Sequence, residues 1–117
     1  MSEFIIYHNN RCSKSRQALQ LLEQHNKKIS IVDYLKTPPD AQTLDRIISM
    51  LGFTSARQLM RQGEALYKQQ NLDCASLSET DLINAMVQHP VLIERPIVLT
   101  QDKAVLGRPP ENVLSLL

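Results

Sequence analysis

Cys12 is the residue whose surroundings most favour nucleophilic chemistry. Arg11, Lys14 and Arg16 lie within four residues of it, and the segment YHNNRCSKSRQAL, residues 7–19, contains no acid. The cysteine falls where a polar loop meets the predicted start of a helix, and the N–H groups of a first helical turn carry partial positive charge. Because those groups and the cations stabilise a thiolate, we expect a pKa below the roughly 8.5 of a free cysteine.

The sequence leaves open how His8 serves this cysteine. His8 precedes Cys12 by four residues, where it can add a positive charge, accept a proton or simply hydrogen-bond the loop. A buried and inert cysteine is the common alternative, but a loop beside three cations is an unfavourable place for one. A phosphatase loop is excluded, because it needs five residues between its cysteine and its arginine, and Ala18 occupies that arginine position.

The elements that must position Cys12 form a βαβ unit. Residues 3–8 (EFIIYH) and 29–35 (ISIVDYL) are short and apolar, which predicts two strands. Residues 13–25 predict a helix between them, with one apolar face. A strand–helix–strand unit of this length joins parallel strands. We therefore expect Cys12 just beyond the carboxyl end of the first strand.

The rest of the chain predicts a helical middle followed by a hairpin. Asp40 and Gly52 are the expected N-cap and stop of one helix. The predicted elements are helices over 40–52, 55–63, 78–90 and 109–117, and a hairpin over 96–107. The fold class is therefore α/β and thioredoxin-like, a mixed four-stranded sheet flanked by helices with a helical insertion at about residues 40–90. We expect one domain over residues 1–117.

Composition narrows the class of protein. The chain has 117 residues and a formal net charge of +1, which argues against a general nucleic-acid or membrane-surface binder. It has no apolar run as long as a membrane span and no secretory signal pattern, so we expect a reduced, cytoplasmic protein. Three scattered histidines, and two cysteines without a partner at zinc spacing, predict no metal site. We also expect no bound cofactor.

Five segments in one order resemble the glutaredoxin-dependent arsenate reductase family. They are YHNNRCSKSR, YLKTPPD, LMRQ, LIERPIV and GRPPENVL, which together extend over essentially the whole chain. The resemblance is closest to the short chromosomal branch of that family, which is related to Spx-type proteins. It implies reduction of arsenate to arsenite through a covalent thiol–arsenate adduct, with glutathione as co-substrate and glutaredoxin as partner protein. A monomer is expected.

The resemblance also implies the role of each site residue. The family's nucleophile falls on Cys12, and the proline that is cis in thioredoxin-like proteins falls on Pro96. The oxyanion-binding arginines fall on Arg61, Arg95 and Arg108, and the histidine and serine of the active-site loop fall on His8 and Ser15. Guanidinium forks suit a tetrahedral anion, and cations are needed where a thiolate attacks an anion.

Two positions depart from the family pattern or lie outside it. The family loop commonly has proline where this chain has Asn10, so one φ restraint is lost. Cys74 lies in a polar segment that no family motif covers, and we expect it to be incidental.

Two other functions remain open from the sequence. One is a glutathione-dependent thiol oxidoreductase that uses Cys12 on another substrate. The other is an Spx-type regulator that binds RNA polymerase. Such regulators typically carry two cysteines at the site, whereas Ser15 occupies the second position here.

Overall fold

The computed structural model describes residues 4–101 and 103–117. The chain divides into two compact units. The first consists of Met1–Thr37 and Arg95–Leu117, and the second is Pro38–Glu94. The expected single domain stays a prediction, and each unit is described by itself below.

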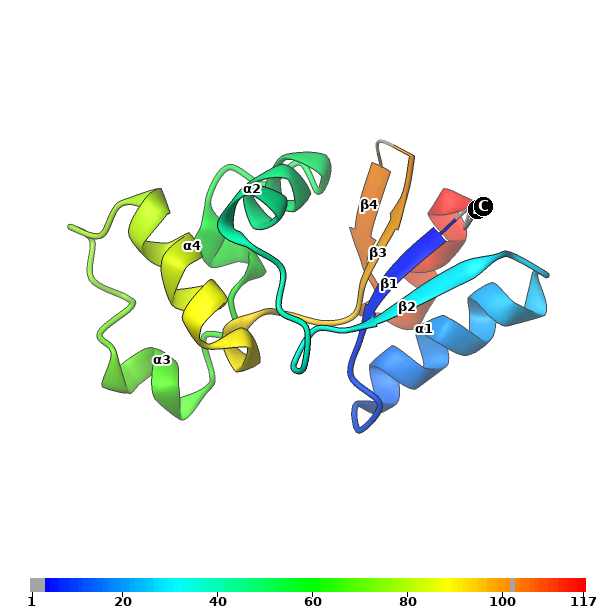
Figure 1. Cartoon of the computed structure of the whole chain (residues 1–117), viewed down its shortest axis with the longest axis horizontal. Helices are drawn as coiled ribbons and strands as arrows, with labels where there is room; N and C mark the ends of the chain where they lie inside the picture. Colours follow the sequence, from blue (N-terminus) through cyan, green and yellow to red (C-terminus); the bar gives the residue numbers. More distant parts are fainter. Residues whose placement is uncertain (1–3, 102) are drawn as a thin grey trace. The chain divides into compact units, whose positions relative to one another are not determined.

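The first unit is built on a four-stranded sheet (Figure 1). The strands follow the order β2-β1-β3-β4, in which β1 and β2 are parallel and the other two pairs are antiparallel. This confirms the predicted mixed sheet, with its parallel βαβ unit and its hairpin. The elements are β1 (Phe4–His8), α1 (Ser13–Gln24), β2 (Ile29–Asp33), β3 (Ile97–Thr100), β4 (Lys103–Leu106) and the 3₁₀ helix η3 (Pro110–Leu116).

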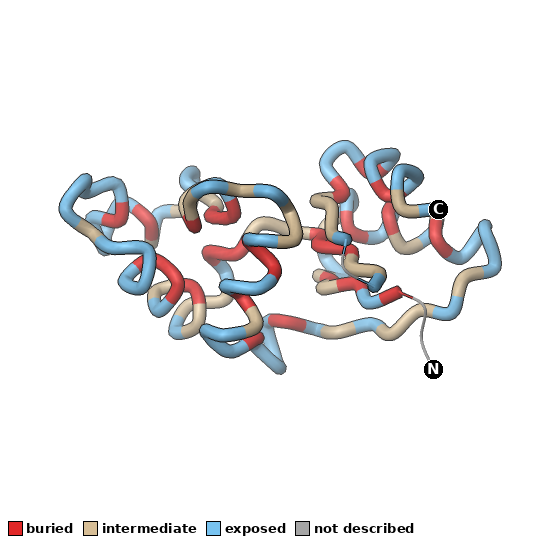
Figure 2. The backbone as a smooth tube through the Cα atoms, turned by 90° about the horizontal axis from the view of Figure 1, so that it is seen from above, coloured by how far each residue is buried: buried red, intermediate tan, exposed pale blue. Residues whose placement is uncertain are grey.

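The core of this unit forms where α1 and η3 pack together against the sheet. Figure 2 marks the buried stretches of the backbone in red. Along β1 the side chains alternate, with Phe4 and Ile6 buried and Ile5 exposed, as the two-residue period of a strand requires. The buried cluster comprises Phe4, Ile6, Ala18, Leu22, Val98 and Val113. The βαβ unit is thus held by apolar burial, and its loop carries Cys12.

The second unit contains α2 (Ala41–Met50), η1 (Ala56–Leu59), α3 (Ala65–Gln69), α4 (Glu79–Gln88) and η2 (Pro90–Leu92). Asp40 caps α2 as predicted, because its side chain accepts a hydrogen bond from the Thr43 N–H at 2.8 Å. Gly52 follows α2 with φ +75°, a conformation that favours glycine. Ser78 and Asp81 form a capping box at the start of α4, within the helix predicted over 78–90.

The predicted helix over 55–63 is wrong beyond Leu59. Ser55 does cap a helical turn, but that turn is a short 3₁₀ helix. Met60 then turns to extended backbone and forms an isolated antiparallel bridge with Ile93. Both side chains are buried, so tertiary pairing overrides the local helical pattern. The sequence also missed α3, which is too short for a helical stripe and buries only Tyr67.

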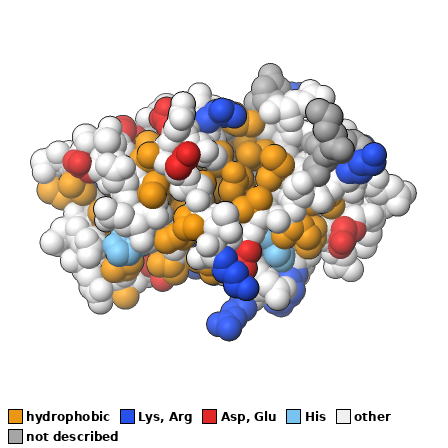
Figure 3. Space-filling view, in the orientation of Figure 1, with side chains coloured by type: hydrophobic (Ala, Val, Ile, Leu, Met, Phe, Trp, Pro, Cys, Tyr) orange, Lys and Arg blue, Asp and Glu red, His pale blue; other side chains and the backbone are white. Residues whose placement is uncertain are grey.

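The surface carries charges of both signs. Lys and Arg side chains project as separate groups on the visible face, with Asp and Glu between them (Figure 3). None of the helices in the described residues is long and apolar enough to cross a membrane.

Candidate functional site

Cys12 is the N-cap of α1, as the sequence predicts. Its backbone is extended, at φ −92° and ψ 123°, and its N–H donates to the Asn9 carbonyl at 3.0 Å. The Cys12 carbonyl accepts from the Arg16 N–H at 3.0 Å, which begins the helical ladder. Its side chain is partly exposed and the thiol is free. A nucleophile in this position is accessible and lies against the orphan N–H groups of the helix.

The pKa of Cys12 is lowered from the ordinary value of a thiol. Partial burial alone raises it, but hydrogen bonds from the Ser15 N–H and the Arg95 side chain outweigh that effect, followed by the Arg95 charge and the Lys14 N–H. The direction agrees with the sequence prediction. The leading cation, however, is Arg95 rather than the three cations next to Cys12 in the sequence.

Two arginines from distant parts of the chain reach the sulfur. The Arg108 Nη1 lies 3.9 Å from the Cys12 Sγ and donates to the Arg95 carbonyl at 3.2 Å. Burial by itself lowers the pKa of the Arg95 guanidinium, but the interactions with Cys12 and Tyr34 together outweigh burial and raise it. Of the three predicted anion-binding arginines, the first unit therefore brings Arg95 and Arg108 to Cys12.

Both arginines precede cis prolines. The Arg95–Pro96 bond is cis, as predicted, and the Arg108–Pro109 bond, which the sequence analysis did not single out, is also cis. The Gly107 N–H donates to the Pro96 carbonyl at 2.9 Å and so ties the two segments together. A Cβ at Gly107 would lie 2.7 Å from the Pro96 Cγ, so this close approach requires glycine.

His8 and Ser15 form a buried pair beneath the loop. The His8 Nδ1 lies 2.6 Å from the Ser15 Oγ, and the same oxygen accepts from the Asn9 N–H at 3.0 Å. The pKa of His8 is lowered chiefly by burial, against the raising effect of Asp33 and with a smaller lowering effect from Arg16. The Nδ1 of a neutral His8 can accept a hydrogen bond from the Ser15 hydroxyl. The structure therefore favours the alternative in which His8 hydrogen-bonds the loop. Ser15 stabilises the Cys12 thiolate through a hydrogen bond from its backbone N–H.

Arg61 lies in the second unit, just after the bridge at Met60. Its Nε contacts Glu64 and its Nη1 contacts Glu94, each at 3.0 Å. The carboxylates neutralise this guanidinium within its own unit. Its meeting with Cys12, Arg95 and Arg108 stays a prediction. The two glutamates are residues that sequence reasoning missed, although Glu94 directly precedes Arg95.

The loop before Cys12 is restrained by hydrogen bonds in place of the missing proline. The Asn9 Oδ1 accepts from the Arg11 N–H at 3.0 Å, and the Arg16 Nη1 donates to the Asn10 carbonyl at 2.9 Å. Asn9 thus organises the loop through both its backbone and its side chain. The signal available in the sequence was an Asn two residues before Arg11, the spacing of an Asx turn.

Cys74 is exposed and free, and its Sγ lies 3.0 Å from the Ser76 Oγ. Hydrogen bonds with Ser76 lower its pKa. Its expected incidental role stays a prediction. Within residues 4–101 and 103–117, no group of three or more His, Cys, Asp or Glu is placed to hold a metal ion.

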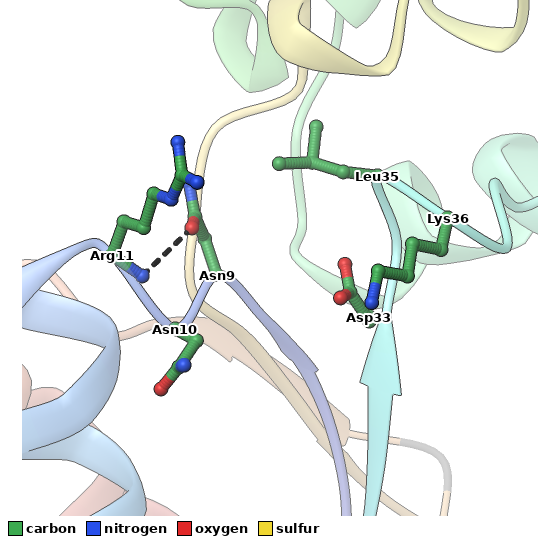
Figure 4. Close-up of a pocket in the computed structure, with 6 residues that line it drawn as sticks. All are labelled: Asn9, Asn10, Arg11, Asp33, Leu35 and Lys36. Carbon is green, nitrogen blue, oxygen red and sulfur yellow. Dashed lines mark hydrogen bonds between the residues drawn. The ribbon is translucent and has the colours of Figure 1, made fainter.

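A cavity of about 490 Å³ lies beside the Cys12 loop (Figure 4). The loop supplies one wall and the end of β2 with the turn after it supplies the other. The lining residues are Asn9, Asn10, Arg11, Asp33, Leu35 and Lys36.

The sheet topology, the cis proline and a cysteine at the N-terminus of α1 define a thioredoxin-like protein. The chain belongs to the ArsC family, which it matches over residues 7–116. It is 49% identical to the arsenate reductase of Neisseria meningitidis serogroup B over 100% of both chains. It is 56% identical to an Escherichia coli K12 protein named uncharacterized protein YfgD, over 95% of this chain and 93% of that one. The solved arsenate reductase of Vibrio cholerae superposes with a TM-score of 0.97 at 46% identity, over 99% of this chain and 98% of that one.

Proposed function

We propose that this protein is an arsenate reductase that uses Cys12 as its nucleophile. The observation that carries the proposal is the contact of the Cys12 thiol with the guanidinium groups of Arg95 and Arg108. A lowered thiol pKa and two adjacent cations suit attack on an anion. Full-length similarity to proteins named arsenate reductase supports arsenate as that anion.

The first step joins sulfur to arsenic. The Cys12 thiolate attacks dihydrogen arsenate, an S–As bond forms and an As–O bond breaks. The departing hydroxyl group takes up one proton, equivalent to the one that the thiol lost on ionising, and leaves as water. Guanidinium forks on Arg95 and Arg108 neutralise the oxygens as the anionic sulfur approaches.

The second step reduces arsenic with glutathione, which is the co-substrate we propose. Its thiol adds at arsenic, the two sulfurs then join, and the electron pair of the S–As bond stays on arsenic. Arsenic(V) becomes arsenic(III), two thiols become one disulfide, and the glutathione proton leaves on arsenite. Glutaredoxin then attacks the glutathione sulfur and releases Cys12. Such a cycle needs a reducing compartment, so we place the protein in the cytoplasm.

Arg61 is proposed as the third anion ligand. To serve arsenate it must exchange Glu64 or Glu94 for the substrate, since both carboxylates already contact its guanidinium. Because Glu64 and Glu94 offset its charge, Arg61 should attract an anion less strongly than Arg95 or Arg108 does.

Arsenite production by the purified protein, with arsenate, glutathione and glutaredoxin, tests the proposal. We expect turnover with the full mixture, and loss of turnover when any one component is omitted or Cys12 is replaced by Ser. Arsenite formation that persists in the Cys12→Ser variant would contradict the proposal. Circular dichroism of the variant controls for folding.

The ion pairs of Arg61 favour one second candidate, a glutathione-dependent thiol oxidoreductase acting on another substrate. Its site would need fewer free cations, which agrees with an Arg61 held by Glu64 and Glu94. Reduction of a glutathione mixed disulfide that is unaffected by replacing Arg61 and Arg108, together with no arsenite formation by the unmodified protein, would favour it.

A further inference from the structure

The cavity beside the Cys12 loop is lined mostly by charged and polar residues, and one of them, Arg11, is the chain neighbour of the nucleophile. Arg11 precedes Cys12 in the chain, and the Asn9 carbonyl accepts the Cys12 N–H at 3.0 Å. Across the cavity from these loop residues lie Asp33, Leu35 and Lys36 (Figure 4). Its volume of about 490 Å³ lies within the range of small-molecule sites, roughly 300–1,000 Å³.

The charged groups of the cavity match those of one class of ligand. Arg11 and Lys36 are cations and Asp33 is a carboxylate. A γ-glutamyl peptide thiol such as glutathione carries two carboxylates and one ammonium group. Its two negative charges can pair with the two cations of the cavity, and its positive charge can pair with the carboxylate. The side-chain amides of Asn9 and Asn10 offer donors and acceptors for its two peptide bonds. The exposed side chain of Leu35 can cover its apolar atoms.

We infer that this cavity is the glutathione subsite, in which Arg11 and Lys36 bind the two carboxylates and Asp33 binds the ammonium group. The choice of ligand rests on the proposed function, in which glutathione attacks the arsenic bound to Cys12. A tripeptide spans at most about 10 Å when extended. Glutathione held beside Asn9 and Arg11 can therefore place its central thiol near Cys12.

The site also serves the intermediate that follows arsenite release. In the Cys12–glutathione mixed disulfide the glutathionyl group remains tethered at Cys12, and the same side chains can retain its charged ends. The glutathione sulfur is then the atom that glutaredoxin attacks. A free glutathione and a glutathionyl group on Cys12 present the same carboxylates and ammonium to the cavity.

Binding of S-methylglutathione, which has no reactive thiol, tests the site without requiring turnover. In ¹H–¹⁵N spectra of the full chain we expect shifts at residues 9–11 and 33–36. Lys36→Ala should weaken binding roughly two- to fivefold, in the range of a single exposed ion pair, and Lys36→Glu about tenfold. Lys28→Ala is the matched control, because Lys28 is exposed just before β2, at the strand's other end, and should leave affinity unchanged.

A change of ligand tests the role of Asp33. Asp33→Asn should weaken binding of S-methylglutathione but have little effect on its N-acetyl derivative, which lacks the ammonium group. Equal losses for both ligands would overturn the assigned orientation. Unchanged affinity in both Lys36 variants, or shifts confined to other residues, would overturn the site.

The kinetic test separates this inference from the proposed function. Lys36→Glu should raise the KM for glutathione while leaving the rate of Cys12 alkylation by iodoacetamide unchanged. An active arsenate reductase with the same glutathione KM in Lys36→Glu would overturn the subsite and leave the proposed function standing. Binding of S-methylglutathione in the cavity by a protein that forms no arsenite would support the subsite and contradict the reductase.

Discussion

The Arg108 guanidinium lies 3.9 Å from the Cys12 sulfur, although the two residues are 96 positions apart in the sequence. The sheet makes this contact possible, because β3 pairs with β1 on one side and with β4 on the other. The Gly107–Pro96 hydrogen bond then ties the segment after β4 to the segment before β3. The cationic environment of Cys12 thus depends on closure of the whole first unit.

Replacing Arg108 by Ala should lower kcat/KM for arsenate about ten- to a hundredfold. A hydrogen bond to a charged group contributes roughly 1.5–3 kcal/mol, and about 1.4 kcal/mol corresponds to one decade in rate. Arg108→Lys should recover only part of the loss, because lysine keeps the charge without the fork. Steady-state arsenite formation measures both variants. Arg46→Ala, on the exposed side of α2, is the control and should be silent.

The same measurement ranks the three arginines. We expect Arg95→Ala to cost at least as much as Arg108→Ala, since Arg95 also stabilises the thiolate. Arg61→Ala should cost less than either, because Glu64 and Glu94 already neutralise it. Near wild-type kcat/KM in both Arg95→Ala and Arg108→Ala would show that the site does not bind an oxyanion.

Arg95→Ala should raise the pKa of Cys12 toward the value of a free thiol. The variant loses both a hydrogen bond to the sulfur and a nearby positive charge. The pH dependence of iodoacetamide alkylation reports this pKa. The measurement belongs in a Cys74→Ser background, because Ser76 also lowers the pKa of Cys74. A Cys12 pKa that is the same with and without Arg95 would show that Arg95 does not activate the thiol.

His8 should make stability fall as the pH drops below neutrality. Burial lowers its pKa in the folded protein, whereas the unfolded chain binds the proton near the ordinary value of about 6.5. The unfolded state therefore binds more protons below that pH, and the free energy of unfolding decreases until the folded pKa is passed. The full stability is present above about pH 6.5. Urea unfolding between pH 7 and 5 measures this fall in the free energy of unfolding. His8→Asn should remove the part of the pH dependence that His8 causes.

The fold could be predicted from the sequence where local patterns agree with tertiary packing. The alternation in β1, the caps at Asp40 and Ser78, and the hairpin all have short-range signatures. The region after Ser55 could not be predicted, because the Met60–Ile93 bridge joins segments that are distant in sequence. No local pattern reports such a pairing.

The site could be predicted in part. The position of Cys12 at a helix start and the cis Arg95–Pro96 bond both agree with the structure. The source of positive charge could not be read from the neighbourhood of Cys12, since Arg95 reaches it from the segment before β3 and nearby Arg16 binds the Asn10 carbonyl. The carboxylate partners of Arg61 likewise required the folded chain.

Cys74→Ser should leave arsenate reduction nearly unchanged, whereas Cys12→Ser should abolish it. The proposed cycle uses one protein thiol and an external resolving thiol, and Cys74 lies in the second unit. Initial rates of arsenite formation with saturating glutathione and glutaredoxin compare the two variants. Loss of turnover in a folded Cys74→Ser variant would indicate an internal disulfide relay.

Gly107→Ala should destabilise the first unit and impair the site together. A Cβ there would lie 2.7 Å from the Pro96 Cγ and 3.2 Å from the Ala18 Cβ, and neither atom belongs to a flexible side chain that can swing away. Overpacking of this kind costs about 1–3 kcal/mol of unfolding free energy. The displaced segment carries Arg108, and it pushes against the ring of Pro96, which follows Arg95. We therefore expect kcat/KM for arsenate to fall as well.

Gly63→Ala is the matched control, because nothing lies within 4 Å of its added Cβ. Its change in unfolding free energy should stay within about 0.5 kcal/mol. Urea unfolding and steady-state kinetics on both variants measure the two effects. Wild-type stability and activity in Gly107→Ala would show that Pro96 and the Arg108 segment do not need this close contact.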